Sequence, residues 1–142
     1  MANMFDKYFI CDETFCNLEE DGKITGFQVG IKVSYYRGVN LAIVDDYEVE
    51  VDGQRYPKEQ IHFTLRDIPY TYEEMRGRTD VHWDFGEIAY LRVEKEGGLP
   101  DGQHTVKVHE ADRTVNGMNI PPVMFCANGE KKLTLMPPVE VP

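Results

Sequence analysis

The sequence has no apolar run that approaches the ~20 residues needed to cross a bilayer. Its first residues also lack the basic start and long apolar stretch of a signal peptide, so we expect a cytoplasmic protein. Positive charge is scarce: 15 Lys and Arg stand against 25 Asp and Glu in 142 residues, giving a net charge of −10. This balance argues against nucleic acid and anionic membranes as partners, because like charges would face each other.

Cysteine is rare as well, with Cys11, Cys16 and Cys126 alone in the chain. An odd number cannot all pair within one chain, and we expect buried, reduced thiols. A metal site or a reactive thiol is the alternative. However, the Cys11 and Cys16 spacing has no second cysteine pair or nearby histidine to complete a zinc site.

Recognisable catalytic motifs are absent. The sequence contains no Gly-rich phosphate loop, no His-Glu-x-x-His zinc helix and no Gly-x-Ser-x-Gly nucleophile elbow. Four histidines remain, and none is spaced to chelate a metal locally. We therefore expect no catalytic residue and no metal ligand in this chain. Two alternatives stay open: a distributed metal site that uses His62 or His82 with an aspartate, and a calcium site at acidic pairs such as Asp45 and Asp46.

What the chain does have is period-2 alternation, which is typical of strands. Residues 27–35 place Phe27, Val29 and Ile31 on one face and polar residues on the other. A second alternating run covers residues 47–51 and stops at Asp52 and Gly53, a pair suited to a tight turn. Residues 15–18 are expected to pair back through the polar segment 19–23.

Further strands are predicted at residues 61–65, 88–94 and 104–109, and a helical turn near residue 72. Asn128 and Gly129 predict a hairpin between strands at 123–127 and 131–135. Seven to nine strands without a substantial helix indicate an all-β fold, an antiparallel β-sandwich of the fibronectin type III or immunoglobulin-like kind. No repeat or linker divides the chain, so we expect one domain over residues 1–142.

One segment gives a histidine a structural role. Residues 99–108 resemble the loop-to-strand corner of such sandwiches, where a tyrosine usually bonds to the preceding loop. His104 stands where that tyrosine is expected. We therefore predict that His104 holds the corner and does not take part in catalysis.

Large side chains gather in segments predicted to be loops. Tyr, Trp, Met and Arg are enriched where proteins bury surface against partners, so these loops are predicted to form a partner interface. The alternative interpretation is packing of the loops over the open ends of the sandwich. The predicted interface residues are Tyr36, Arg37, Trp83, Phe85, Met118, Ile120, Pro121 and Met124.

An ordered set of short segments resembles the small β subunit of bacterial C-glycoside deglycosidases. The segments are MFDKYFIC at 4–11, GFQV at 26–29, YYRGV at 35–39, VEVDG at 49–53, WDFGE at 83–87 and GLPDGQHTV at 98–106. The resemblance runs from about Met4 to Leu135. No single segment is a catalytic motif, so the specificity lies in their order.

The resemblance implies a hetero-oligomeric lyase in which a TIM-barrel α subunit carries a divalent metal, manganese, and the catalytic histidine and carboxylates. Such a complex cleaves the carbon–carbon bond of 3-oxo-C-glycosides, for example flavonoid C-glucosides, to the aglycone and a dehydrated keto sugar. This chain would hold no cofactor. Its expected role is to stabilise and complete the α subunit.

Two other functions remain as alternatives. The first is a free-standing carbohydrate- or protein-binding β-sandwich module, with Tyr36, Trp83 and Phe85 placed to stack on a ligand. The second is a small metalloenzyme, whose metal would be held by His62, His82, Asp80 or Asp84.

Overall fold

The computed structural model describes residues 9–33, 38–114 and 123–141, with the side chains of residues 114 and 123–125 left out. Within these ranges most residues lie in strands. The only α-helix in the described residues is α1 (Tyr72–Met75), which is far too short and polar to span a membrane. The strands are β1 (Ile10–Glu20), β2 (Lys23–Lys32), β3 (Val39–Asn40), β4 (Val44–Val51), β5 (Gln54–Tyr56), β6 (Ile61–Leu65), β7 (Ile68–Tyr70), β8 (His82–Trp83), β9 (Ile88–Glu94), β10 (Gln103–Thr114), β11 (Val123–Thr134) and β12 (Met136–Glu140).

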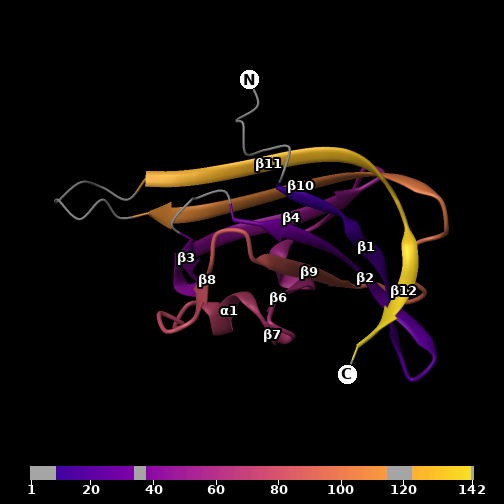
Figure 1. The fold of residues 1–142 in the computed structure, drawn as a ribbon, viewed down its shortest axis with the longest axis horizontal. Coiled ribbons are helices and arrows are strands. Elements are labelled where there is room, and N and C mark those ends of the chain that lie inside the picture. Colours follow the sequence, from indigo (N-terminus) through magenta and orange to yellow (C-terminus); the bar gives the residue numbers. More distant parts are fainter. Residues whose placement is uncertain (1–8, 34–37, 115–122, 142) are drawn as a thin grey trace.

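These strands form two main sheets. One has six strands in the order β12-β1-β2-β9-β6-β7, and the other has four in the order β11-β10-β4-β5. A small third sheet pairs β3 with β8. In Figure 1, β11, β10 and β4 run along the top of the view, and β9, β6 and β7 lie below them. The all-β, sandwich-like fold is confirmed, while the finer fibronectin or immunoglobulin-like assignment stays a prediction.

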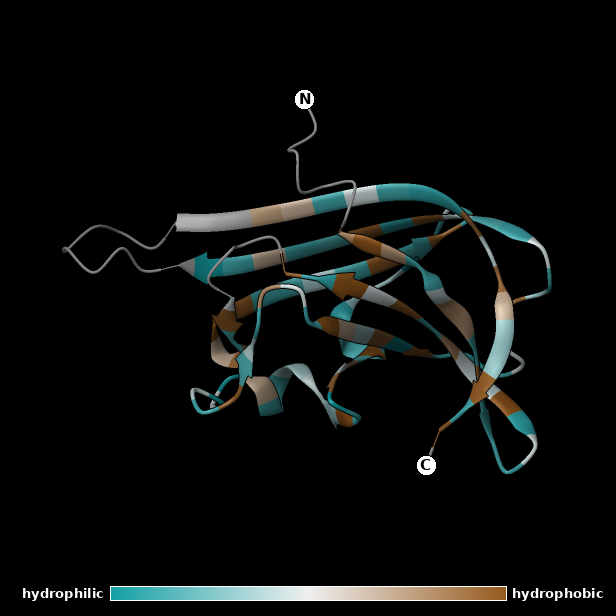
Figure 2. Cartoon of the chain, in the orientation of Figure 1, coloured by the Kyte–Doolittle hydropathy of each residue, from teal (hydrophilic) through white to brown (hydrophobic). Residues whose placement is uncertain are grey.

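The buried apolar side chains of both sheets form one cluster. It includes Phe27, Val29 and Ile31 of β2, which are the alternate residues that the sequence placed on one face. Figure 2 shows the same alternation as bands of brown and teal along the strands. The facing four-stranded sheet contributes Val49 and Val108. Period-2 patterning therefore positions the core between the sheets.

The predicted turns at the ends of β1 and β4 are confirmed. Asp52 and Gly53 have φ angles of 49° and 90°, and β4 reverses there to pair with β5. Asp21 and Gly22 likewise take positive φ between β1 and β2. Positive φ at both central residues is the type I′ pattern, which matches the right-handed twist of the paired strands.

The predicted hairpin at Asn128 and Gly129 is wrong. Both residues lie inside β11, which runs unbroken from Val123 to Thr134 and pairs with β10 along its whole length. A Cβ atom on Gly129 would lie 2.9 Å from the Ile10 side chain, so the glycine allows close packing here. A close approach of two elements, which the sequence does not reveal, is the reason for this glycine.

Other differences concern length and direction. Four strands of two or three residues, β3, β5, β7 and β8, raise the number above the seven to nine expected. They are too short to show a period. The pairing of β12 with β1 is parallel, in contrast to the other strand pairs of the described chain. The predicted helical turn is present as α1, where Thr71 and Glu74 form a capping box.

Candidate functional site

The predicted interface residues fall into three groups. Tyr36, Arg37, Met118, Ile120 and Pro121 lie outside the described residues. The backbone of Met124 lies in β11 opposite Arg113, and its side chain is not described. Trp83 and Phe85 are described, one at the end of β8 and the other in the loop that follows. The interface role of all eight residues stays a prediction.

Trp83 and Phe85 differ sharply in exposure although one residue separates them. The Trp83 side chain is completely buried, and its indole Nε1 donates a hydrogen bond to the Glu87 carbonyl at 2.8 Å. It packs edge-on against Phe63, with ring centroids 5.3 Å apart. Phe85 is 51% exposed. Trp83 therefore supports the loop from inside, and Phe85 is the aromatic ring that this loop presents to solvent.

An arginine ties that loop to the neighbouring hairpin. Arg66, in the turn between β6 and β7, donates hydrogen bonds at 2.8 Å to the Glu87 carboxylate and the His82 carbonyl. Glu87 also accepts a hydrogen bond from the Asp84 backbone N–H at 3.1 Å. The loop around Phe85 is thus held at both ends, which lowers the entropy cost of using it in a contact.

His104 holds the corner as predicted. Its Nε2 lies 2.7 Å from the Pro100 carbonyl, four residues upstream, and its Nδ1 lies 2.6 Å from Asp52 Oδ2. Both partners are acceptors, so the ring satisfies both contacts when it carries two protons. Burial lowers the pKa of His104, but the hydrogen bonds to Asp52 and Pro100 outweigh burial and leave the pKa raised. The contact with Asp52, which joins the β4–β5 turn to β10, was not foreseen.

Two buried acids were missed by the sequence analysis. Glu110 and Asp112 lie on the inner face of β10, and both are fully buried. None of their four carboxyl oxygens has a hydrogen-bond partner among the residues that the structure describes. Burial raises the pKa of Glu110 well above its usual value, and the neighbouring Asp112 adds to the rise. Their even spacing from Val106 and Val108 was the available signal, because alternate residues of a strand share a face.

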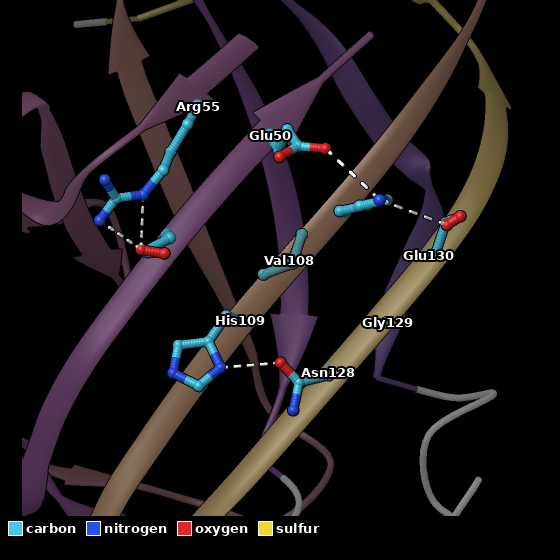
Figure 3. A pocket seen from close by; sticks show the side chains of 9 residues that line it. Glu50, Arg55, Val108, His109, Asn128, Gly129 and Glu130 are labelled. Atoms are coloured by element: carbon cyan, nitrogen blue, oxygen red, sulfur yellow. Dashed lines mark hydrogen bonds and ion pairs between the residues drawn. The ribbon is translucent and has the colours of Figure 1, made fainter. Parts of the chain in front are cut away.

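The outer face of the four-stranded sheet carries a shallow pocket of about 330 Å³ (Figure 3). Its polar residues are paired with one another across the strands. Arg55 donates to Glu48 at 2.8 Å, and His109 Nδ1 lies 2.8 Å from Asn128 Oδ1. The Arg55 hydrogen bond lowers the pKa of Glu48. The pocket is lined by Glu48, Glu50, Arg55, Lys107, Val108, His109, Asn128, Gly129 and Glu130.

A larger pocket, about 660 Å³, lies on the outer face of the six-stranded sheet. Strand register places Cys16, Gln28, Arg92 and His62 in one row across β1, β2, β9 and β6. Arg92 and His62 line the pocket, together with Leu18, Gly26 and Pro69 and the hairpin residues around them. This row joins residues up to 76 positions apart in the chain, and the sequence patterns alone gave no indication of it.

Gln28 fixes the arginine of this row. Its side chain is only 5% exposed, and its Nε2 lies 3.6 Å from Cys16 Sγ. Its Oε1 accepts a hydrogen bond from Arg92 Nε at 3.1 Å. Arg92 is 17% exposed and Nη2 lies 3.9 Å from Asp67 Oδ1, beyond hydrogen-bond distance. The guanidinium is therefore oriented through one nitrogen, while its two terminal nitrogens have no hydrogen-bond acceptor among the described side chains and backbone.

The two histidines of the metalloenzyme alternative lie in different sheets. His62 is in β6 of the six-stranded sheet, and His82 is in β8, with Nδ1 3.1 Å from Asn40 Oδ1. Across residues 9–33, 38–114 and 123–141, no group of three or more His, Cys, Asp or Glu is arranged to hold a metal ion. The cysteines are free thiols: Cys16 is buried, Cys11 is half-buried and Cys126 is exposed.

Comparison with known proteins identifies the family. The family described as "C-glycoside deglycosidase beta subunit" matches residues 5–115. A C-glycoside deglycosidase beta subunit from Eubacterium cellulosolvens is 41% identical over 103 residues, which cover 72% of this chain and 70% of that protein. One from Arthrobacter globiformis is 29% identical over 58 residues, covering 41% of this chain and 44% of that protein. A match of this extent shows that the chain belongs to the C-glycoside deglycosidase beta subunit family.

Proposed function

We propose that this chain is the β subunit of a cytoplasmic C-glycoside deglycosidase complex and that it stabilises and completes a catalytic α subunit. The observation that carries the proposal is the family match over residues 5–115. The positions of three titratable side chains agree with this proposal. His104 is hydrogen-bonded at both ring nitrogens, and Glu110 and Asp112 are buried between the sheets. These groups are enclosed by the fold, so the reacting groups would come from the partner.

The proposed partner is a TIM-barrel α subunit with a bound divalent metal, manganese, as its cofactor. The proposed substrate is a 3-oxo-C-glycoside such as an oxidised flavonoid C-glucoside. A general base of the α subunit would remove the proton beside the keto group. The electron pair then forms a C=C bond within the sugar, the bond to the aglycone carbon breaks, and that carbon takes up a proton. The products are the aglycone and a dehydrated keto sugar; the metal would supply Lewis acidity.

Co-expression tests the proposal. The chain and a C-glycoside deglycosidase α subunit from the same genome are produced together and passed through a size-exclusion column. We expect one peak that contains both chains and cleaves a 3-oxo-C-glycoside, and an α subunit that loses activity when purified alone. Two separate peaks, with an α subunit fully active by itself, would contradict the proposal.

The loops predicted from sequence remain part of this proposal as contacts of the α subunit. Phe85 offers the sharpest test, because its ring is exposed while its loop is held by Arg66. Phe85→Ser is expected to weaken association and to leave turnover normal once the α subunit is saturated. A large loss of turnover at saturation would mean that the loop reaches the active site.

A second candidate is a carbohydrate-binding module, favoured by the polar pocket over β4, β10 and β11 (Figure 3). Its volume suits one sugar ring, and His109, Asn128 and Glu130 could bond to hydroxyl groups. Calorimetry of the isolated chain with C-glycosides and simple sugars tests this function. Heat that disappears in Asn128→Ala would support it, and no heat with the wild-type chain would rule it out.

A further inference from the structure

The pocket over Arg92 carries an inference that rests on the proposed function and deepens it. We propose that this pocket, on the outer face of the six-stranded sheet, is the docking site for an acidic side chain of the α subunit. The carboxylate would lie against the terminal nitrogens of Arg92. The site would thus be part of the subunit interface, on a face that the loop-based sequence prediction did not include.

The first argument is the state of Arg92. An arginine whose side chain is 17% exposed has lost most of its hydration, and its forked donors normally find a carboxylate in return. Here Asp67 is 3.9 Å away and is itself 81% exposed. Asp67 therefore provides little compensation, because an exposed pair at that distance contributes at most about 1 kcal/mol.

The second argument is preorganisation. Gln28 is buried in the sheet surface and fixes Arg92 through Nε, which leaves Nη1 and Nη2 directed away from that contact. Gly26, which lines the pocket two residues before Gln28, cannot carry a side chain, because a Cβ atom there would clash with the Val93 carbonyl oxygen. A fixed guanidinium loses little entropy when it takes a bidentate carboxylate partner.

The third argument is the surrounding face. The row next to Arg92 contains Gly30, Tyr90 and Thr64, and Thr64 is completely buried although it points away from the core. Tyr90 and Ile88 are half-buried. This uncharged row with its aromatic ring, next to one largely buried arginine, has the composition of an interface centre.

The charges at the pocket edge are mixed, with a small excess of acids. Lys23 and Lys95 lie there together with Glu20, Glu94 and Glu96, all at or next to hairpin turns. Exposed charges of both signs at a rim affect the association rate more than the affinity. The contact that selects the partner is therefore expected at the centre of the pocket, where the guanidinium of Arg92 can bind a carboxylate.

The experiment measures the dissociation constant of the complex by calorimetry with purified α subunit. Arg92→Gln is expected to weaken binding by at least about 30-fold, as for loss of a desolvated charge pair. The matched control is Arg55→Gln, an exposed arginine on the other sheet that is paired with Glu48. That control should stay within about fivefold of the wild type.

A second variant guards against misfolding of Arg92→Gln. Pro69→Glu adds a carboxylate at an exposed position that lines the pocket, so that Arg92 is occupied from within the chain. It is expected to weaken association, whereas Asn128→Glu, an exposed position in the other pocket, is not. Thermal unfolding by circular dichroism verifies that each variant is folded.

The outcomes separate the two proposals. A wild-type chain that does not bind the α subunit contradicts the proposed function. A wild-type chain that binds, with Arg92→Gln and Pro69→Glu within fivefold of it, overturns this inference alone. Saturable binding of succinate to the isolated chain, lost in Arg92→Gln without an effect on association, would also overturn it, because the pocket would then serve a small carboxylate.

Discussion

The outer faces of the two sheets use polar residues in opposite ways. On the four-stranded sheet, charged side chains stand in rows and neutralise one another: Lys107 lies 3.6 Å from Glu50 and 3.9 Å from Glu130. On the six-stranded sheet, the charged side chains around the pocket lie mainly at the hairpin turns, and the central Arg92 is held by the neutral Gln28. The charges of the four-stranded sheet are thus already paired with one another, whereas the terminal nitrogens of Arg92 have no hydrogen-bond acceptor among the described residues.

The inner faces differ as well. The inward-facing residues of the six-stranded sheet are mostly apolar, such as Val29 and Leu91, and the polar Asn17 among them is uncharged. The four-stranded sheet turns Glu110, Asp112 and His104 inward at its two ends. Burying an ionised carboxyl without a partner is costly, and burial accordingly raises the pKa of both acids. Both sheets therefore supply apolar core residues, and the four-stranded sheet also supplies buried titratable groups.

The largest effect is expected from giving the apolar sheet an acid of its own. Leu91→Asp would place a carboxyl at a completely buried position of β9. We expect a loss of more than about 4 kcal/mol of unfolding free energy, from a lost leucine and a desolvated acid together. Urea titration followed by circular dichroism measures it, with Leu91→Met as the volume-matched control. A Leu91→Asp chain about as stable as Leu91→Met would break the contrast between the inner faces.

The second prediction concerns Glu110 and pH. Its raised pKa means that the native state keeps a proton that the unfolded chain releases, so stability falls as pH rises above the unfolded value of about 4.3. Glu110→Gln keeps the shape and removes this loss. Its advantage over the wild type should grow by about 1.4 kcal/mol per pH unit until the native carboxyl ionises.

Urea titrations between pH 5 and pH 8 measure that advantage. The control is Glu130→Gln, an exposed glutamate on the outer face of the same sheet, which should not change the slope. Parallel pH profiles for the wild type and Glu110→Gln would show that Glu110 is ionised throughout and that a cation compensates it.

A matched pair of polar truncations compares the outer faces. Gln28→Ala removes the group that orients Arg92 and is expected to cost about 1–3 kcal/mol, because a buried hydrogen-bond partner is lost. Asn128→Ala on the other sheet removes an exposed amide and should stay within about 0.5 kcal/mol. Equal costs, measured by urea unfolding, would show that the two faces are equally solvated.

The smallest effect is expected at the His104 corner. The hydrogen bond from His104 lowers the pKa of Asp52, so that contribution is lost as pH falls and Asp52 is protonated. The raised pKa of His104 means that its contribution is lost as pH rises and the ring gives up a proton. Asp52→Asn should therefore lower the melting temperature by about 2–4 °C at intermediate pH and by less at either extreme. A constant difference across the range would indicate a neutral ring.

The sequence predicted the fold well wherever neighbouring residues determine the local structure. The bounds of β6 and β9, the turn at Asp52 and the corner at His104 all follow from neighbouring residues. The same turn chemistry failed at Asn128 and Gly129. There the glycine allows close packing against Ile10, which is 119 positions away in the chain. No local sequence pattern indicates that contact.

The candidate site was harder to foresee for the same reason. Gln28 and Arg92 meet because β2 and β9 pair in one particular register, across 64 residues of chain. The sequence correctly placed Gln28 on the polar side of its strand, but it could not name the partner. The two buried acids were within reach, since Glu110 continues the alternation of Val106 and Val108. Hydrophobic patterning thus predicts which face of a strand a residue occupies, whereas the strand register decides which residues meet to form a site.

The central claim is that the six-stranded sheet faces the α subunit, and histidine labelling tests it most directly. The outer face of each sheet has one accessible histidine, His62 on the six-stranded sheet and His109 on the four-stranded sheet. Diethyl pyrocarbonate labelling, read by mass spectrometry with and without the α subunit, reports on both faces in one sample. We predict that labelling of His62 falls several-fold in the complex and that of His109 stays unchanged. Protection of His109 with unchanged labelling of His62 would contradict the account.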